Sequence, residues 1–193
     1  PWLLVGEGKM SKSKGNVIYA DNLVELFGVD AVRYYLLHEM PFANDGTITY
    51  ELLIERTNSD LANILGNLVN RTVTMCHRYQ NGVMGSHDVC EPVDEELKQV
   101  CLEAPEKVRR AMDQLKVGDA IDEVFAIFRR ANKYIDETMP WALAKDMEHN
   151  GARLAHVMYN LLETTRICGI LLTPFMPDSM AKLFAQIGAE PAA

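Results

Sequence analysis

Apolar side chains recur at intervals of three and four residues through almost all of the chain after residue 50. This spacing is typical of amphipathic helices that turn one stripe toward a core. The apolar stretches are separated by short segments that contain glycine or proline, which tend to end helices. Amphipathic helices joined by short connections predict an antiparallel helical bundle. The expected helices span residues 50–79, 93–115, 119–139, 151–172 and 179–187.

Glycine and proline also predict where these helices end or bend. Asn81-Gly82 should close the first helix, and Gly118 should separate the second helix from the third. Pro105 lacks a backbone N–H and should kink or restart the second helix. Pro140 should end the third, and the charged stretch 145–150 should lead into the fourth.

The first long helix has two distinct faces when its residues are placed at about 100° intervals. One face is apolar and consists of Leu61, Ile64, Leu65, Leu68, Met75 and Cys76. The opposite face is polar and consists of Asp60, Asn63, Asn67, Arg71, Thr74 and Arg78.

The N-terminal part of the chain follows a different pattern. Residues 2–5 form a short apolar run before a glycine, which predicts a buried strand. Asp21 or Asn22 should cap one short helix and Asp30 a second. Residues 47–49 alternate as a short strand does.

Together these patterns predict a mainly α fold with two parts. An antiparallel helical bundle takes residues 49–193, and a small α/β segment over residues 1–48 precedes it. A segment of this size buries too little surface to be stable alone, so it should lean on the bundle. The abrupt start of the chain in a strand suggests a piece of a larger protein.

The loop over residues 9–17 reads Lys-Met-Ser-Lys-Ser-Lys-Gly-Asn-Val. A lysine on a mobile loop can meet charge that develops on phosphate oxygens during a transfer reaction, and hydroxyls and backbone amides add hydrogen bonds. Such a loop suits a triphosphate. A P-loop is excluded because Leu3 stands where its first glycine is required, and Met10 stands where Ser or Thr should follow.

Composition and charge narrow the class of protein. The 193 residues are 48% hydrophobic and 24% charged, with a net charge of -8. This acidic balance argues against a protein that coats nucleic-acid backbones, so RNA would have to bind on a local patch. No apolar run approaches the roughly 20 residues that span a bilayer, and we expect a cytoplasmic protein. The cysteines form no Cys-x-x-Cys pair, so we expect neither zinc nor a disulfide.

Asn67, Arg71 and Trp141 are candidates for a binding site. Asn67 and Arg71 are four residues apart, so they share a helix face and can read the open edge of a base in single-stranded RNA. Trp141 follows a helix-breaking proline and could give a stacking surface. If the helix that ends near Thr138 runs antiparallel to the helix with Asn67, all three would meet. The residues alone leave open a solvated face for the pair and packing across a helix end for Trp141.

Residues 9–13 match the signature loop of class I aminoacyl-tRNA synthetases, and Gly15-Asn16 continues it. Asp45-Gly46, Asn67-x-x-x-Arg71 and the run 134–141 make the chain similar to the methionyl-tRNA synthetase family. The resemblance covers nearly all of the chain. It corresponds to the end of the catalytic domain, a stem-contact fold over residues 21–49, and the anticodon-binding helical bundle.

The resemblance implies a ligase that makes methionyl-tRNA from ATP, methionine and tRNA through methionyl-adenylate. In that reading Lys9, Met10, Ser11, Lys12 and Ser13 bind ATP, and Lys9 and Lys12 stabilise the pyrophosphate in the transition state.

The same resemblance implies that Asn67, Arg71 and Trp141 recognise the CAU anticodon of tRNA(Met). The second nucleotide-binding signature of the family, its methionine pocket and its zinc-bearing insertion are missing from this sequence. The chain alone should therefore be inactive, should bind no zinc, and should work with the missing catalytic domain.

Two alternatives stay open. Similar loops occur in the leucyl, isoleucyl, valyl and cysteinyl enzymes, so the chain could be an anticodon-binding fragment of another class I synthetase. The second alternative is a helical interaction module that binds no RNA, in which residues 9–15 match by chance.

Overall fold

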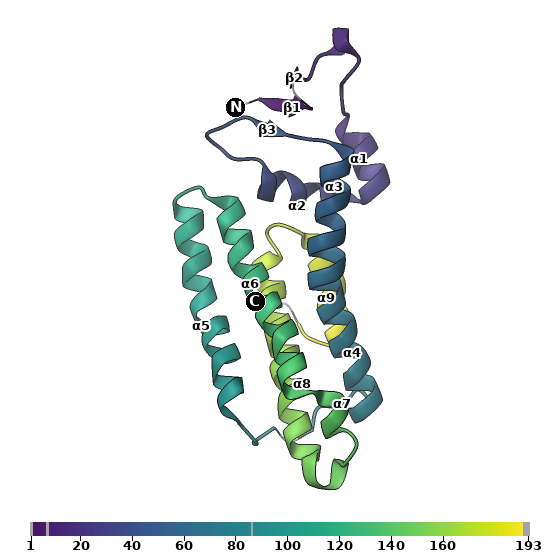
Figure 1. Ribbon diagram of the computed structural model, residues 1–193, viewed down its shortest axis with the longest axis vertical. Helices are drawn as coiled ribbons and strands as arrows, with labels where there is room; N and C mark the ends of the chain where they lie inside the picture. Colours follow the sequence, from purple (N-terminus) through teal and green to yellow (C-terminus); the bar gives the residue numbers. More distant parts are fainter. Residues whose placement is uncertain (1, 7, 86, 191–193) are drawn as a thin grey trace.

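The computed structural model describes residues 2–6, 8–85 and 87–190 (Figure 1). It confirms the predicted fold class, because a helical bundle makes up most of the chain and a small α/β segment precedes it. None of the helices in these residues combines the length and the apolar character that crossing a bilayer requires.

A small sheet forms the start of the N-terminal segment, with strands β1 (Leu3–Val5), β2 (Gly8–Lys9) and β3 (Gly46–Thr47). The central strand β1 pairs antiparallel with β2 and parallel with β3, so Leu4 faces both Lys9 and Thr47. The prediction of a buried strand is wrong, since Leu3 is 44% exposed. The reason is that β1 turns only Val5 toward the small core beneath it.

Two helices complete this segment, α1 (Ala20–Phe27) and α2 (Val29–Glu39). Their N-caps are Tyr19 and Gly28, and neither cap has a side-chain hydrogen bond. The predicted caps Asp21, Asn22 and Asp30 are therefore wrong, because these residues lie inside the first turns. An acidic side chain there still interacts favourably with the positive end of the helix dipole.

Helix α2 ties the N-terminal segment to the bundle. Asp30 accepts a hydrogen bond from the backbone N–H of Ser179 at 2.5 Å. Arg33 donates to the carbonyl oxygens of Pro174 at 2.8 Å and Phe175 at 3.0 Å. The small segment therefore leans on the far end of the chain, as its size predicts.

The first long helix is continuous through three parts, α3 (Tyr50–Arg56), the π-helical part η2 (Thr57–Gly66) and α4 (Asn67–Gln80). It ends as predicted at Asn81, which has a φ of 53°. The π-helical part has wider turns than an α-helix, so it shifts the faces of the residues around it. Asp60 was predicted to lie on the polar face opposite the apolar one, but it is turned toward α2, where it is only partly exposed and accepts a hydrogen bond from the Tyr34 hydroxyl at 2.9 Å.

The rest of the bundle consists of α5 (Pro92–Asp113), α6 (Val117–Thr138), the short α7 (Pro140–Leu143), α8 (Met147–Leu172) and α9 (Pro177–Ile187). The predicted interruption at Pro105 is absent from α5, which runs through it. Buried Ala104 and Val108 on either side hold the helix against the core. Gly118 lies in the first turn of α6 and does not separate two helices.

The remaining differences concern the helix ends. The charged stretch 145–150 forms most of the first turn of α8, because Asp146 accepts the backbone N–H of His149 at 3.2 Å and caps the helix. Leu115 matched the apolar stripe, but it lies in the turn after α5 with a φ of 58° and is 66% exposed.

Neighbouring helices along the chain run in opposite directions, so the first and third long helices run the same way (Figure 1). The Asn132 side chain of α6 donates to the carbonyl of Ile64 at 3.2 Å, and further along both helices Asp136 meets Arg71. The expected antiparallel pairing of these two helices is therefore wrong. The parallel arrangement still brings the C-terminal ends of α4 and α6 to the same end of the bundle.

Candidate nucleic-acid interface

Asn67 and Arg71 lie on α4, where Asn67 is exposed and Arg71 is half-buried. The Arg71 guanidinium Nη2 lies 3.0 Å from Oδ1 of Asp136 on α6. This ion pair crosses between the two helices and gives the guanidinium a carboxylate partner on α6. Sequence reasoning did not single out Asp136 as a site residue, although Asp136 lies within the run 134–141.

Trp141 is placed by the turn between α6 and α7. Helix α6 ends at Thr138, Met139 follows it in a left-handed conformation with a φ of 45°, and Pro140 begins α7. Pro140 is buried, whereas Trp141 is 43% exposed. Trp141 therefore lies exposed in the short helix α7, and Figure 1 shows α7 at the end of the bundle that also holds the end of α4.

Asn132 is a second residue that sequence reasoning missed. Its amide nitrogen donates to the carbonyl of Ile64 at 3.2 Å and to that of Phe128 at 3.1 Å. Ile64 lies in the π-helical part, just before Asn67. Asn132 therefore attaches α6 to the turn that sets the direction of Asn67. Its spacing of four residues before Asp136 was the available signal.

A buried polar network holds α5, α6 and α8 together close to this end. Arg153 makes two hydrogen bonds to the Asp94 carboxylate, at 2.8 and 2.9 Å, and the Tyr134 hydroxyl donates to it at 2.5 Å. Burial alone would raise the pKa of Asp94, but the hydrogen bonds from Arg153 and Tyr134 outweigh it and lower that pKa below its ordinary value. Burial and the Asp94 charge raise the pKa of Tyr134.

One group of side chains has the composition of a metal site. The ligand atoms of Cys90, Asp94 and His156 all lie within 4.8 Å of one another. However, each Asp94 oxygen already accepts two hydrogen bonds, Oδ1 from Tyr134 and Arg153, and Oδ2 from Arg153 and the backbone N–H of Glu91. The nearby Arg153 charge also opposes a cation. The group is better explained as part of the buried ion-pair network.

The predicted triphosphate loop begins at the end of β2. The Lys9 ammonium lies 4.5 Å from the centre of the Trp2 ring. Asn16 closes the loop, since its side chain accepts the Ser11 N–H at 2.9 Å and donates to the Lys9 carbonyl at 3.3 Å. Met10 packs against the small N-terminal core.

The rest of this loop is exposed. Residues Lys12–Lys14 form a short 3-10 turn, η1, and Lys12, Ser13 and Lys14 are exposed. The hydroxyl groups of Ser11 and Ser13 are hydrogen-bonded at 2.8 Å. With Lys9, which is also exposed, the loop presents three lysines to the outside, next to the hydrogen-bonded hydroxyl groups of Ser11 and Ser13.

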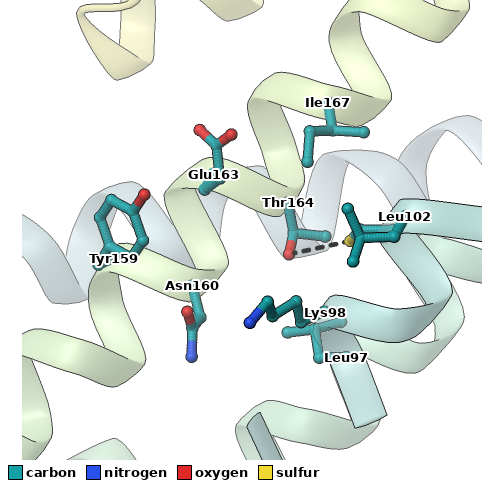
Figure 2. A pocket seen from close by; sticks show the side chains of 9 residues that line it. Leu97, Lys98, Leu102, Tyr159, Asn160, Glu163, Thr164 and Ile167 are labelled. Atoms are coloured by element: carbon teal, nitrogen blue, oxygen red, sulfur yellow. Dashed lines mark hydrogen bonds between the residues drawn. The ribbon is translucent and has the colours of Figure 1, made fainter. Parts of the chain in front are cut away.

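A cleft of about 240 Å³ lies between α5 and α8, and it contains none of the predicted site residues. Figure 2 shows Lys98 and Leu102 from α5 facing Asn160 and Thr164 from α8 across it. The cleft lies between α5 and α8, whereas Asn67 and Arg71 lie on α4.

Comparisons with known proteins show the family to which this chain belongs. A family model for class I tRNA synthetases (M) matches residues 1–73. A second family model, the anticodon binding domain of methionyl tRNA ligase, matches residues 87–193, which is more than half of the chain.

Individual relatives agree. The methionine–tRNA ligase of Caldanaerobacter subterraneus subsp. tengcongensis is 52% identical over 97% of this chain and 29% of its own length. That of Clostridium perfringens is 49% identical over 98% of this chain and 29% of its own length. The structure of Mycobacterium tuberculosis methionyl-tRNA synthetase in complex with methionyl-adenylate superposes with a TM-score of 0.93, at 35% identity, over 98% of this chain and 38% of that one.

The fold and the N-terminal match define a piece of a class I tRNA synthetase. The chain belongs to the methionyl-tRNA ligase family, and residues 87–193 match the anticodon-binding domain of that family. It spans less than a third of the length of the curated relatives that it matches. The predicted resemblance is confirmed, and neither alternative finds support.

Proposed function

We propose that this chain binds the anticodon of tRNA(Met) for an enzyme that joins methionine to that tRNA. The observation that carries the proposal is the Arg71–Asp136 ion pair, because it joins the polar face of α4 to the helix that leads into Trp141. The match of residues 87–193 to the anticodon-binding family supports the same conclusion.

Asn67, Arg71 and Trp141 act together on the cytosine of the CAU anticodon. The ring nitrogen N3 of cytosine accepts a hydrogen bond, whereas that of uracil carries a proton and donates one. A guanidinium has only donors, so Arg71 favours cytosine over uracil. Asn67 supplies a further donor, and Trp141 stacks on the base.

The exposed loop takes part in the catalytic step of the full-length enzyme. Lys9, Met10, Ser11, Lys12 and Ser13 form one side of an ATP site, and the ammonium groups of Lys9 and Lys12 stabilise pyrophosphate as methionyl-adenylate forms. Met10 contributes to the ATP site by anchoring the loop on the small N-terminal core. Because the remainder of the catalytic domain lies outside this chain, the chain alone is inactive and holds no zinc.

The missing catalytic domain is the second partner. Large apolar side chains are exposed on the N-terminal segment, where a docked domain would cover them: Trp2, Leu3, Tyr19, Leu26 and Val29. We place the boundary between the end of the catalytic part and the anticodon-binding bundle at residues 48 and 49. The enzyme acts in the cytoplasm.

The test is binding of an RNA hairpin with a CAU loop, compared with one in which cytosine is replaced by uracil. The chain should prefer the hairpin with cytosine. Arg71→Ala should lower the affinity and should reduce the discrimination between the two hairpins by about 1–3 kcal/mol. Arg110→Ala on α5 is the matched control, since Arg110 is an exposed, ion-paired arginine on another helix. Equal binding of the two hairpins by the parent chain would refute the proposal.

A further inference from the structure

One exposed side of α6 connects the two halves of this molecule. Its residues follow one another at intervals of three and four, so they lie on one side of the helix. We call this side the α6 face, and it consists of Asp122, Ala126, Arg129, Lys133 and Asp136. All of these residues except the half-buried Ala126 are exposed.

Each end of the α6 face contacts a different part of the chain. Asp122 lies 3.2 Å from Nε2 of His38 in the N-terminal segment. Asp136 pairs with Arg71 at the proposed base-reading site. At 1.5 Å per residue the two ends are about 21 Å apart. Figure 1 shows α6 lying between α5 and the long helix that contains α4.

Two cations lie between these ends, Arg129 and Lys133, separated by about one helical turn. Within the part of the chain that the structure describes, the one hydrogen bond of the Arg129 side chain goes to the carbonyl of Asp122, at 3.5 Å. Lys133 lies 3.3 Å from a carboxylate oxygen of Glu137 in an exposed pair, and such pairs contribute little to stability. Both cations can therefore turn to another anion at small cost.

We propose that the α6 face binds the phosphate backbone of the anticodon stem, with Arg129 and Lys133 each contacting one phosphate. The inference rests on the proposed function. A hairpin whose loop is read beside Arg71 must send its stem away from that end. The other end of the α6 face meets the segment that carries Lys12, which faces the ATP in the proposed enzyme. An RNA that serves both sites passes along the face that joins them, and the small side chain of Ala126 leaves room for it.

The inference predicts a particular salt dependence. Phosphate contacts release counterions, so each contact steepens the fall of affinity with salt, whereas contacts to base edges set the preference for cytosine. Arg129→Gln and Lys133→Gln should each reduce the slope of log K against log salt by about 1. The preference for the CAU hairpin over its uracil variant should stay that of the parent. Lys107→Gln is the matched control, because Lys107 of α5 lies 3.1 Å from Glu103 in an equivalent exposed pair.

A seven-nucleotide single strand with the loop sequence separates stem from loop contacts. If Arg129 and Lys133 contact the stem, both variants should bind this strand with the slope of the parent. The same loss on the single strand would place the contacts in the loop and overturn the assignment. If the parent prefers cytosine but both variants bind the hairpin with the salt slope of the parent, the inference is overturned and the proposed function stands. If the parent chain shows no preference for cytosine, both the proposed function and this inference are overturned.

Discussion

Arg71 of α4 and Asp136 of α6 are 3.0 Å apart across two helices that run in the same direction. Asp136 is 67% exposed at its side chain, and Arg71 is 29% exposed. The carboxylate therefore orients the guanidinium from the solvent side, and it also places a negative charge where RNA would approach. These two effects act on RNA binding in opposite ways, and a single substitution separates them.

Asp136→Asn should raise the affinity for RNA hairpins and reduce the discrimination between the CAU hairpin and its uracil variant. The affinity rises because a charge that repels phosphate is removed. The preference for cytosine over uracil falls because Arg71 loses the partner that orients it. Titrations with the CAU hairpin and its uracil variant measure both. Asp113→Asn, which breaks an exposed pair with Arg109 on α5, should change neither. A fall in affinity for both hairpins would contradict this role of Asp136.

Asp94→Asn should destabilise the chain at neutral pH by about 3 kcal/mol, the lower end of the range for breaking a buried ion pair, because Arg153 loses its buried partner and keeps the more exposed Glu91 carboxylate at 3.2 Å. The pKa of Asp94 is lowered in the folded state. Its contribution is therefore complete above the unfolded pKa of about 3.9 and is lost as the pH falls through the lower folded pKa. Urea unfolding at several pH values should show the variant and the parent converging in acid.

Tyr134→Phe gives a milder test of the same network. It removes one hydrogen bond to the Asp94 carboxylate and leaves both contacts with Arg153. The free energy of unfolding at neutral pH should fall by about 1.5–3 kcal/mol, the usual range for a hydrogen bond to a charged group. A variant as stable as the parent would show that Arg153 and the Glu91 backbone N–H satisfy Asp94 without the tyrosine.

The helices could be predicted from the sequence because their apolar spacing is local information, and the end at Asn81 follows from turn chemistry. The face of Asp60 could not be predicted in the same way. A π-helical part shifts the phase of the helix, and the contact that holds it, from Asn132 to the Ile64 carbonyl, comes from a distant part of the chain.

The site shows the same division. Asn67, Arg71 and Trp141 were predicted from residue type and from resemblance, and their role stays a prediction, but their arrangement depends on the direction of α6. In an up-and-down bundle the first and third helices run the same way, which the residues of either helix alone do not specify. Asp136 was missed because an aspartate on a helix surface is ordinary until its partner is known.

Gly118→Ala should destabilise the junction between α2 and α6 by about 1–3 kcal/mol, the usual range for overpacking. A Cβ atom there would lie 2.6 Å from the carbonyl oxygen of His38, and backbone on both sides limits the adjustment. Gly151→Ala in α8 is the matched control. Its Cβ would make an ordinary contact at 3.8 Å with Met147, so the higher helix propensity of alanine should stabilise the chain by roughly 1 kcal/mol. Urea unfolding of the two variants should give opposite signs.

In the full-length enzyme, Lys12→Ala should slow methionyl-adenylate formation far more than it weakens methionine binding. The Lys12 side chain is exposed on the η1 turn, and its proposed role is to meet charge that develops only during the transfer. Single-turnover kinetics with a methionine titration separate the two quantities. Equal losses in rate and in methionine affinity would exclude a role confined to the transition state.

Trp141→Ala should weaken binding of the CAU hairpin by roughly 1–3 kcal/mol for each base that stacks on it. The salt slope should stay unchanged, because an uncharged ring makes no ionic contact with phosphate. Trp141→Phe should recover part of the loss, since a smaller aromatic ring still stacks. Trp2→Ala is the control, because Trp2 is the other tryptophan of the chain, is 62% exposed, and lies in the N-terminal segment. If both tryptophan variants bind the hairpin as the parent does, Trp141 has no part in reading the anticodon.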